Sequence, residues 1–229
     1  MARRSLFAAL LLSVLLLPQG DGGLTARTVP QGDAATGTAI PQGDNAQGDD
    51  FLRRVRERIV QSQPFRVDFV QQVYVDEDMT LQESGFIVYA GRDLVKWQYS
   101  DPEDKTFILE NGRYRFYDRE NNQLLRGRVG ERGRQLIWEL LFSGKPGQAS
   151  SWDARQRLIR LRLDGEGGVE ELKIRVGADF LPERVEQTGA NEVTTVYVFK
   201  NYRSRVALQP GEFDLSVPAD AEIIEDQAP

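Results

Sequence analysis

The fold is decided by residues 65–100, which read FRVDFVQQVYVDEDMTLQESGFIVYAGRDLVKWQYS. From Phe65 to Val75, apolar and polar side chains largely alternate. A repeat of two residues is typical of a strand with one buried face. Polar turns at residues 76–78 and 91–93 divide the stretch, so it predicts three consecutive strands joined by tight turns.

The same pattern continues through the rest of the chain. Asn111-Gly112 lies between two such runs and is a strong hairpin signal, because both turn residues need positive φ. Further strands are predicted at residues 106–109, 113–117, 123–129, 158–163, 169–176, 183–188 and 193–202, with a last extended stretch at 213–218. Since no long crossover helices join them, we expect an antiparallel sheet, and one this large must curl or close.

Two helical segments accompany the strands. Phe51, Val55 and Ile59 share one face of a helix predicted over residues 51–61, with Asp49 or Asp50 as its N-cap. The sequence QLIWELLF at residues 135–142 predicts a short apolar helix in the middle of the chain. Both helices are available to cover the open mouth of the curled sheet.

Three regions follow from composition along the chain. Residues 1–20 carry Arg3 and Arg4 before an apolar run too short to span roughly 30 Å of hydrocarbon, which predicts a secretory signal; an uncleaved anchor is the alternative. Residues 21–50 repeat the tetrapeptide PQGD and carry little apolar surface, so we expect a disordered linker. Residues 51–229 form the predicted domain.

Composition excludes several kinds of chemistry. The chain of 229 residues has no cysteine and no histidine, which removes disulfides, thiolate nucleophiles, Cys-ligated zinc and every His-dependent dyad. We expect no metal and no cofactor. The formal net charge of -6 disfavours nucleic acid as a partner, because phosphate contacts need a basic face.

Several short motifs follow one another along residues 51–229. They are Phe69-Val70-Gln71, Gly85 in SGFIVYAGR, Lys96-Trp97-Gln98-Tyr99, the hairpin LENG at residues 109–112, Phe180-Leu181-Pro182, and Phe213 to Pro218 near the end of the chain. Each motif is weak alone, but in their order and spacing together they resemble the LolA family of outer-membrane lipoprotein carriers.

The resemblance implies a mainly β fold with a few helices: an incomplete antiparallel barrel of about eleven strands with a helical lid. It implies a periplasmic carrier that receives acylated lipoproteins from an inner-membrane ABC lipoprotein exporter and delivers them to an outer-membrane lipoprotein receptor. That receptor is anchored through a cysteine, so a chain without cysteine resembles the carrier. We expect a monomer and no enzymatic activity.

The resemblance and the apolar pattern together predict the site residues. The expected lipid-binding cavity consists of Phe69, Trp97, Tyr99, Phe116, Trp138, Leu140 and Leu141. The alternative is that these aromatic side chains pack into an ordinary core. In the family an arginine after the second strand holds the lid, and the candidates here are Arg92 and Lys96; a solvated turn charge is the alternative for Arg92.

Other functions stay open at this stage. The same fold could bind another lipid or sense envelope stress. An enzyme with a carboxylate pair is formally possible, but the acidic clusters at residues 76–78 and 170–171 are typical of solvated turns. A purely structural envelope protein would have no cavity and no ligand.

Overall fold

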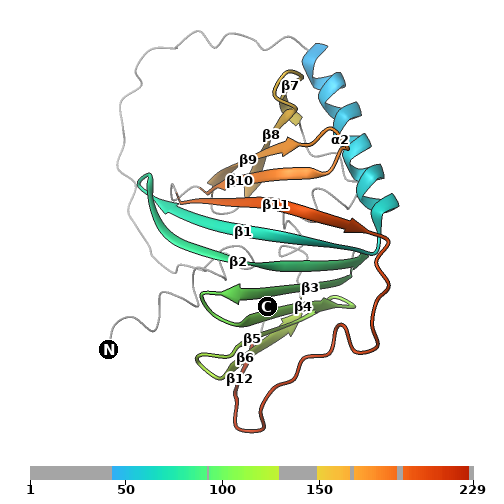
Figure 1. The fold of residues 1–229 in the computed structure, drawn as a ribbon. Helices are drawn as coiled ribbons and strands as arrows, with labels where there is room; N and C mark the ends of the chain where they lie inside the picture. Colours follow the sequence, from blue (N-terminus) through green and yellow to red (C-terminus); the bar gives the residue numbers. More distant parts are fainter. Residues whose placement is uncertain (1–42, 92, 129–148, 166–167, 190–192, 227–229) are drawn as a thin grey trace.

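The computed structural model describes residues 43–91, 93–128, 149–165, 168–189 and 193–226 (Figure 1). These residues form one helix and one twelve-stranded sheet. The elements are α2 (Gly43–Ser62), β1 (Phe65–Val75), β2 (Asp78–Gly91), β3 (Leu94–Asp101), β4 (Lys105–Glu110), β5 (Arg113–Asp118), β6 (Gln123–Arg128), β7 (Ala149–Asp153), β8 (Leu158–Gly165), β9 (Gly168–Val176), β10 (Pro182–Thr188), β11 (Thr194–Ser204) and β12 (Glu222–Glu225).

The sheet is open, with β12 and β7 at its two edges. The strand order is β12-β6-β5-β4-β3-β2-β1-β11-β10-β9-β8-β7. All neighbouring pairs are antiparallel except β12 and β6, which run parallel. The mainly β fold and the incomplete barrel predicted from sequence are confirmed, because strands curl around one face without closing (Figure 1).

The two faces of the sheet differ in polarity. We call the face that carries Phe69, Trp97 and Tyr197 the inner face, and the face that carries Lys96 and Tyr117 the outer face. On β1 every second residue from Phe65 to Val73 is buried, as the alternation of strand side chains requires. The inner face forms one continuous hydrophobic cluster, and α2 packs against it through Phe51, Leu52, Val55 and Ile59.

The helix begins earlier than predicted. It starts at Gly43 rather than Phe51, so the last eight residues of the expected disordered linker, 43–50, are helical. Asp50 is therefore no N-cap but lies inside the helix, where its carboxylate binds Arg53 at 2.5 Å and Arg54 at 2.9 Å. Ion pairs between side chains three and four residues apart stabilise a helix. Together with the buried face that begins at Phe51, they allow the helix to start N-terminal to the predicted position.

Two strands, β7 and β12, were not predicted, and the predicted extended stretch at 213–218 is not a strand. β7 (ASSWD) and β12 (EIIE) are short edge strands with no clear alternation of polar and apolar residues. Residues 213–218 belong to a connection that contacts the outer face, where Arg115 donates to the carbonyl oxygen of Phe213, before β12 pairs with β6. An ion pair between Arg126 and Glu225 at 2.5 Å and a hydrogen bond from Gln123 to Glu222 at 2.7 Å tie this edge together.

Gly85 marks an irregularity in the middle of β2. The register with β3 shifts between Ser84 and Gly85, as in a bulge. A Cβ atom at this position would lie 1.9 Å from the carbonyl oxygen of Gln98. Only glycine permits this close approach of the two backbones, which brings the inner-face side chains of β1 and β3 together.

Candidate functional site

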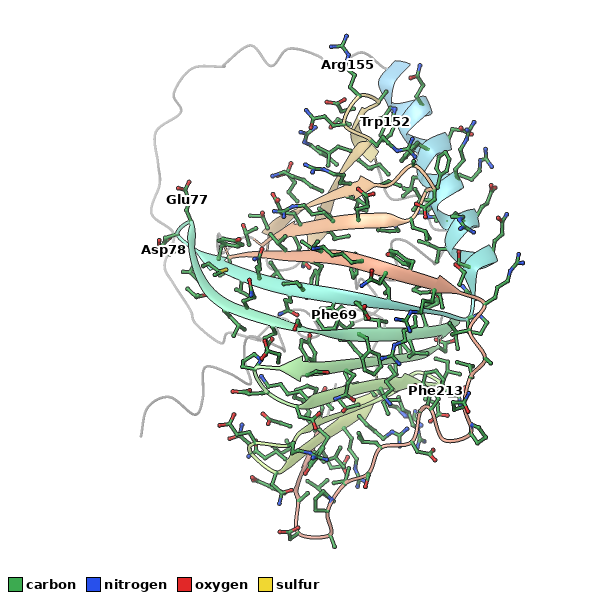
Figure 2. All side chains as sticks on the ribbon, in the orientation of Figure 1. Phe69, Glu77, Asp78, Trp152, Arg155 and Phe213 are labelled. Atoms are coloured by element: carbon green, nitrogen blue, oxygen red, sulfur yellow. The ribbon has the colours of Figure 1, made fainter. Side chains whose placement is uncertain are left out.

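Three of the predicted cavity residues form one aromatic cluster on the inner face. The ring of Phe69 contacts Trp97 and Tyr99 edge-on, with centroids 5.2 Å and 5.1 Å away. Trp97 also meets the ring of Tyr197 from β11 at 5.5 Å. Figure 2 places Phe69 in the middle of the sheet, far from Glu77 and Asp78 at the tip of the β1–β2 hairpin. The cluster therefore forms the centre of the inner face.

The other predicted cavity residues have different positions. Phe116 pairs with Phe107 on the same face and is partly buried against the core. Trp138, Leu140 and Leu141, with the predicted helix at 135–142, lie outside the described residues, as does the latch candidate Arg92. In this structure the aromatic side chains pack as they would in an ordinary core, which was the alternative to an open cavity: Trp97 is 7% exposed and Tyr99 is 4% exposed.

An aromatic and cationic contact anchors α2 over one end of the inner face. The ring of Phe51 lies 3.9 Å from Trp152 and 5.3 Å from Phe180. The guanidinium group of Arg157 is 5.2 Å from Phe51 and 4.9 Å from Phe180, within the range of cation–π attraction. Arg157 also donates hydrogen bonds to the carbonyl oxygens of Val176 and Gly177, at 3.1 Å and 2.6 Å. The helix is thus held to the β8–β10 end of the sheet.

Among the described residues, Lys96 binds the C-terminal connection and no helix. Because it alternates with Trp97, its side chain lies on the outer face, where its ammonium group donates to the carbonyl oxygen of Glu212 at 3.1 Å. The role of lid latch stays a prediction for Lys96, whose side chain lies on the face opposite to the one that α2 covers. Of the described residues, Phe51 and Arg157 come nearest to a latch. The sequence did not predict a role for either residue, because their partners lie on β7 and in the β9–β10 turn, far away along the chain.

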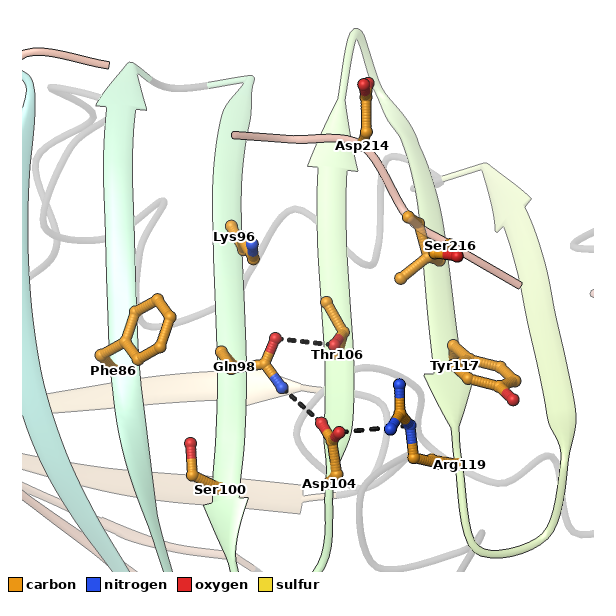
Figure 3. A pocket seen from close by; sticks show the side chains of 11 residues that line it. Phe86, Lys96, Gln98, Ser100, Asp104, Thr106, Tyr117, Arg119, Asp214 and Ser216 are labelled. Carbon is orange, nitrogen blue, oxygen red and sulfur yellow. Dashed lines mark hydrogen bonds and ion pairs between the residues drawn. The ribbon is translucent and has the colours of Figure 1, made fainter. Parts of the chain in front are cut away.

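A groove of about 490 Å³ lies beneath the C-terminal connection on the outer face (Figure 3). Its walls combine apolar side chains with polar ones, and part of the polar set is paired within the protein: Gln98 binds Asp104 at 2.6 Å and Thr106 at 2.8 Å, and Arg119 binds Asp104 at 3.2 Å. It is lined by Phe86, Lys96, Gln98, Ser100, Asp104, Thr106, Tyr117, Arg119, Asp214, Leu215 and Ser216. An acyl chain in this groove would cover the charged pair of Asp104 and Arg119 without hydrogen-bonding to either side chain, which is unfavourable.

The inner face also contains a buried ion pair. The ammonium group of Lys105 on β4 lies 2.8 Å from Oε1 of Glu83 on β2, and these side chains are 3% and 1% exposed. A second carboxylate, Glu103, approaches Lys105 at 2.5 Å. Burial lowers the pKa of Lys105, but hydrogen bonds from its ammonium group to Glu103 and Glu83 outweigh this effect and raise the pKa above its ordinary value. Lys105 therefore stays charged in the interior.

Two tyrosines and a glutamine lie next to this pair. Tyr99 donates a hydrogen bond from its hydroxyl to Oε1 of Gln71 at 2.9 Å. Burial raises the pKa of Tyr99 and of Tyr197, and the negative charge of Glu83 raises both further. A signal for this cluster was present in the sequence, since Gln71, Glu83 and Lys105 occupy inward positions of otherwise apolar alternating strands.

The described residues contain neither a metal site nor a membrane-spanning helix. No group of three or more acidic, histidine or cysteine side chains there is placed to hold a metal ion. In the same part of the chain, no helix has the length and apolar character needed to cross a membrane.

Comparison with known proteins agrees with this architecture. Residues 60–216 match the family described as outer membrane lipoprotein carrier protein LolA. A curated outer-membrane lipoprotein carrier protein from Methylococcus capsulatus is 24% identical over 183 residues, covering 76% of this chain and 87% of the relative.

Two solved structures are similar at lower identity. An uncharacterized conserved protein from Thermus thermophilus is 15% identical with a TM-score of 0.49, covering 79% of this chain and 98% of its own. A LolA superfamily protein from Nitrosomonas europaea is 9% identical with a TM-score of 0.43, covering 72% and 94%. Both scores are below 0.5, so the family assignment rests on the sequence match.

Proposed function

The chain belongs to the LolA family of outer membrane lipoprotein carrier proteins, and from this premise we propose that it binds the acyl chains of lipoproteins on its inner face. The binding surface in this proposal is the aromatic cluster of Phe69, Trp97, Tyr99 and Phe116. Trp138, Leu140 and Leu141 complete it as predicted from sequence.

The observation that carries the proposal is the width of the apolar inner face relative to the helix that covers it. Twelve strands at roughly 4.8 Å spacing extend over more than 50 Å, whereas an α-helix is about 10 Å wide. In the described part of the chain, α2 is the one helix on this face. It packs near β7, and the aromatic cluster lies toward β3. One side of the open sheet thus carries a continuous apolar surface that is wider than the described helix packed on it.

Binding requires the packed inner face to open. Releasing α2 exposes Phe51, Leu52, Val55 and Ile59, at roughly 1.5–3 kcal/mol for each side chain. Each acyl methylene that becomes buried returns about 0.8 kcal/mol, so roughly 8–15 methylenes offset the opening. Several fully buried chains would otherwise reach the practical limit of about 20 kcal/mol, beyond which cargo is not released. The packed helix therefore moderates affinity to a value that a carrier can use.

The proposed route has two membrane partners. The protein would act as a monomer in the periplasm, accept lipoproteins from an inner-membrane ABC exporter and deliver them to an outer-membrane receptor. Family membership supports this route, and so does the predicted signal at residues 1–20. We propose no catalytic role, no cofactor and no nucleic-acid partner.

A release experiment tests this function. Spheroplasts labelled with radioactive palmitate are incubated with the protein, and labelled lipoprotein is measured in the supernatant. We expect release to depend on the protein and to saturate with its concentration. Label that stays with the spheroplasts at every concentration would refute lipoprotein carriage. Release of labelled phospholipid in place of lipoprotein would mean that the inner face binds a different lipid cargo.

A further inference from the structure

A row of five polar side chains crosses the otherwise apolar inner face. Gln71 on β1 lies between Tyr197 on β11 and Glu83 on β2, each its direct cross-strand partner. Tyr99 on β3 and Lys105 on β4 are likewise direct partners and continue the row. All five side chains are at most 4% exposed. Five neighbouring strands therefore place hydrogen-bonding groups beside the aromatic cluster.

Part of this row is satisfied within the protein. Lys105 binds Oε1 of Glu83, and Tyr99 donates to Gln71. Two atoms of the row are not satisfied in this way. Among the described residues, neither Oε2 of Glu83 nor the hydroxyl of Tyr197 has a hydrogen-bond partner. Folded proteins leave few buried polar atoms without a partner, and each such atom calls for an explanation.

The two atoms offer complementary chemistry. An ionised carboxylate only accepts hydrogen bonds, whereas a tyrosine hydroxyl can donate one. The row itself pairs one carboxylate, Glu83, with one ammonium group, Lys105, but Glu103 also contacts Lys105 from outside the row. Two carboxylates thus surround one ammonium group, and this excess negative charge favours a hydrogen-bond donor over an anion. A ligand that fits must supply one N–H donor and one carbonyl acceptor close to an apolar chain.

We propose that this row binds the amide group that joins an acyl chain to the polypeptide of a lipoprotein, with the amide N–H donating to Glu83 and the amide carbonyl accepting from Tyr197. The inference rests on the proposed function and names the chemical group recognised at that site. An ester-linked chain has no N–H donor, and a phospholipid phosphate is repelled by Glu83. The row thus selects amide-linked acyl chains.

The test compares two ligands that differ by one hydrogen-bond donor. N-lauroyl-Gly-Ser-Ser and its analogue methylated on the acylated nitrogen are titrated into the full-length protein by isothermal titration calorimetry, below their critical micelle concentrations. We expect methylation to weaken binding at least tenfold, roughly the lower end of the loss when a hydrogen bond to a charged group is removed. Tyr197→Phe should weaken binding of the unmethylated ligand about fivefold.

Two variants control for folding and position. Tyr202→Phe removes the hydroxyl of a partly buried tyrosine that already donates to the carbonyl oxygen of Pro182, so it should leave affinity unchanged. The double variant Glu83→Leu with Lys105→Met replaces the ion pair by apolar groups of similar volume, an exchange that proteins often tolerate. In this variant we expect the methylated and unmethylated ligands to bind equally.

The outcomes separate the two proposals. If the wild type binds both ligands equally, or if Tyr197→Phe binds as well as the wild type, acyl binding stands and the amide site is refuted. If the wild type binds neither ligand, acyl binding itself fails, and the amide site fails with it.

Discussion

Trp97 and Tyr197 lie on strands separated by two others in the sheet, yet their ring centroids are 5.5 Å apart. Three strand spacings on a flat sheet would separate them by roughly 14 Å. The sheet must therefore curve toward this face, and the bulge opposite Gly85, where Ser100 is the extra residue on the strand of Trp97, lies within that curve. This curvature concentrates aromatic side chains from β1, β3 and β11 in one place, which is the physical basis of the proposed binding surface.

Substitution of equally buried aromatic residues on the two faces of the sheet should affect acyl binding differently. Trp97→Ala should lower the free energy of unfolding by about 3–5 kcal/mol and abolish acyl binding. Tyr117→Ala, at similar burial on the outer face, should also destabilise the protein but keep acyl binding. Urea unfolding and titration with a lauroyl peptide measure both properties. Equal loss of binding in the two variants would show that the faces do not differ in function.

Loosening α2 should make the inner face more accessible. Phe51→Ala removes the ring that packs on Trp152, Phe180 and Arg157, so we expect a stability loss of about 3–5 kcal/mol. Because opening then costs less, acyl ligands should associate faster, as stopped-flow tryptophan fluorescence would measure. Val60→Ala, on the exposed side of the same helix, is the control and should change neither property. Slower association in Phe51→Ala would mean that α2 forms part of the binding surface.

Gly85 should tolerate no side chain. In Gly85→Ala the added methyl group would overlap the backbone of Gln98, and we expect a loss of about 3 kcal/mol or more in the free energy of unfolding. Gly112→Ala meets no atom within 4 Å and faces only the cost of a positive φ, about 1–2 kcal/mol. Thermal unfolding of both variants provides the comparison. A Gly85→Ala protein as stable as the wild type would show that the bulge can relax.

Alkaline pH should destabilise the protein through its buried groups. The pKa values of Tyr99, Tyr197 and Lys105 are raised in the folded state, so their contribution to stability is complete below pH of about 10 and is lost as pH rises above it. Urea unfolding between pH of about 8 and 11.5 should show this decline. Tyr197→Phe removes one such group, so its stability should fall less steeply with pH. Parallel curves for the two proteins would contradict the burial of a neutral Tyr197.

The sequence predicted most of the sheet because local pattern determines it. Alternation located β1 through β6 and β8 through β11, and Asn111 has the positive φ that the hairpin signal required. It did not predict β7 or β12, because short edge strands are defined by their neighbours. The start of α2 was placed too late for a similar reason, since pairing of Asp50 with Arg53 and burial of Phe51 continue the helix into the linker.

The site was predictable only in part. Phe69, Trp97 and Tyr99 fall on one face by strand parity, and the structure brings them into contact. Lys96 was assigned by analogy to a position in a family motif, and strand parity alone would have placed it opposite Trp97. The row from Tyr197 to Lys105 depends on register across five strands, which is a property of the folded sheet.

The central claim is that the inner face carries acylated lipoproteins, and native mass spectrometry tests it most directly. The protein, expressed with its own N-terminal segment, is recovered from spheroplasts that are synthesising lipoproteins, and its complexes are weighed. We predict a soluble one-to-one complex with an acylated lipoprotein, and its loss in Trp97→Ala but not in Tyr117→Ala. A protein recovered without cargo, or one whose cargo persists in Trp97→Ala, would contradict the claim.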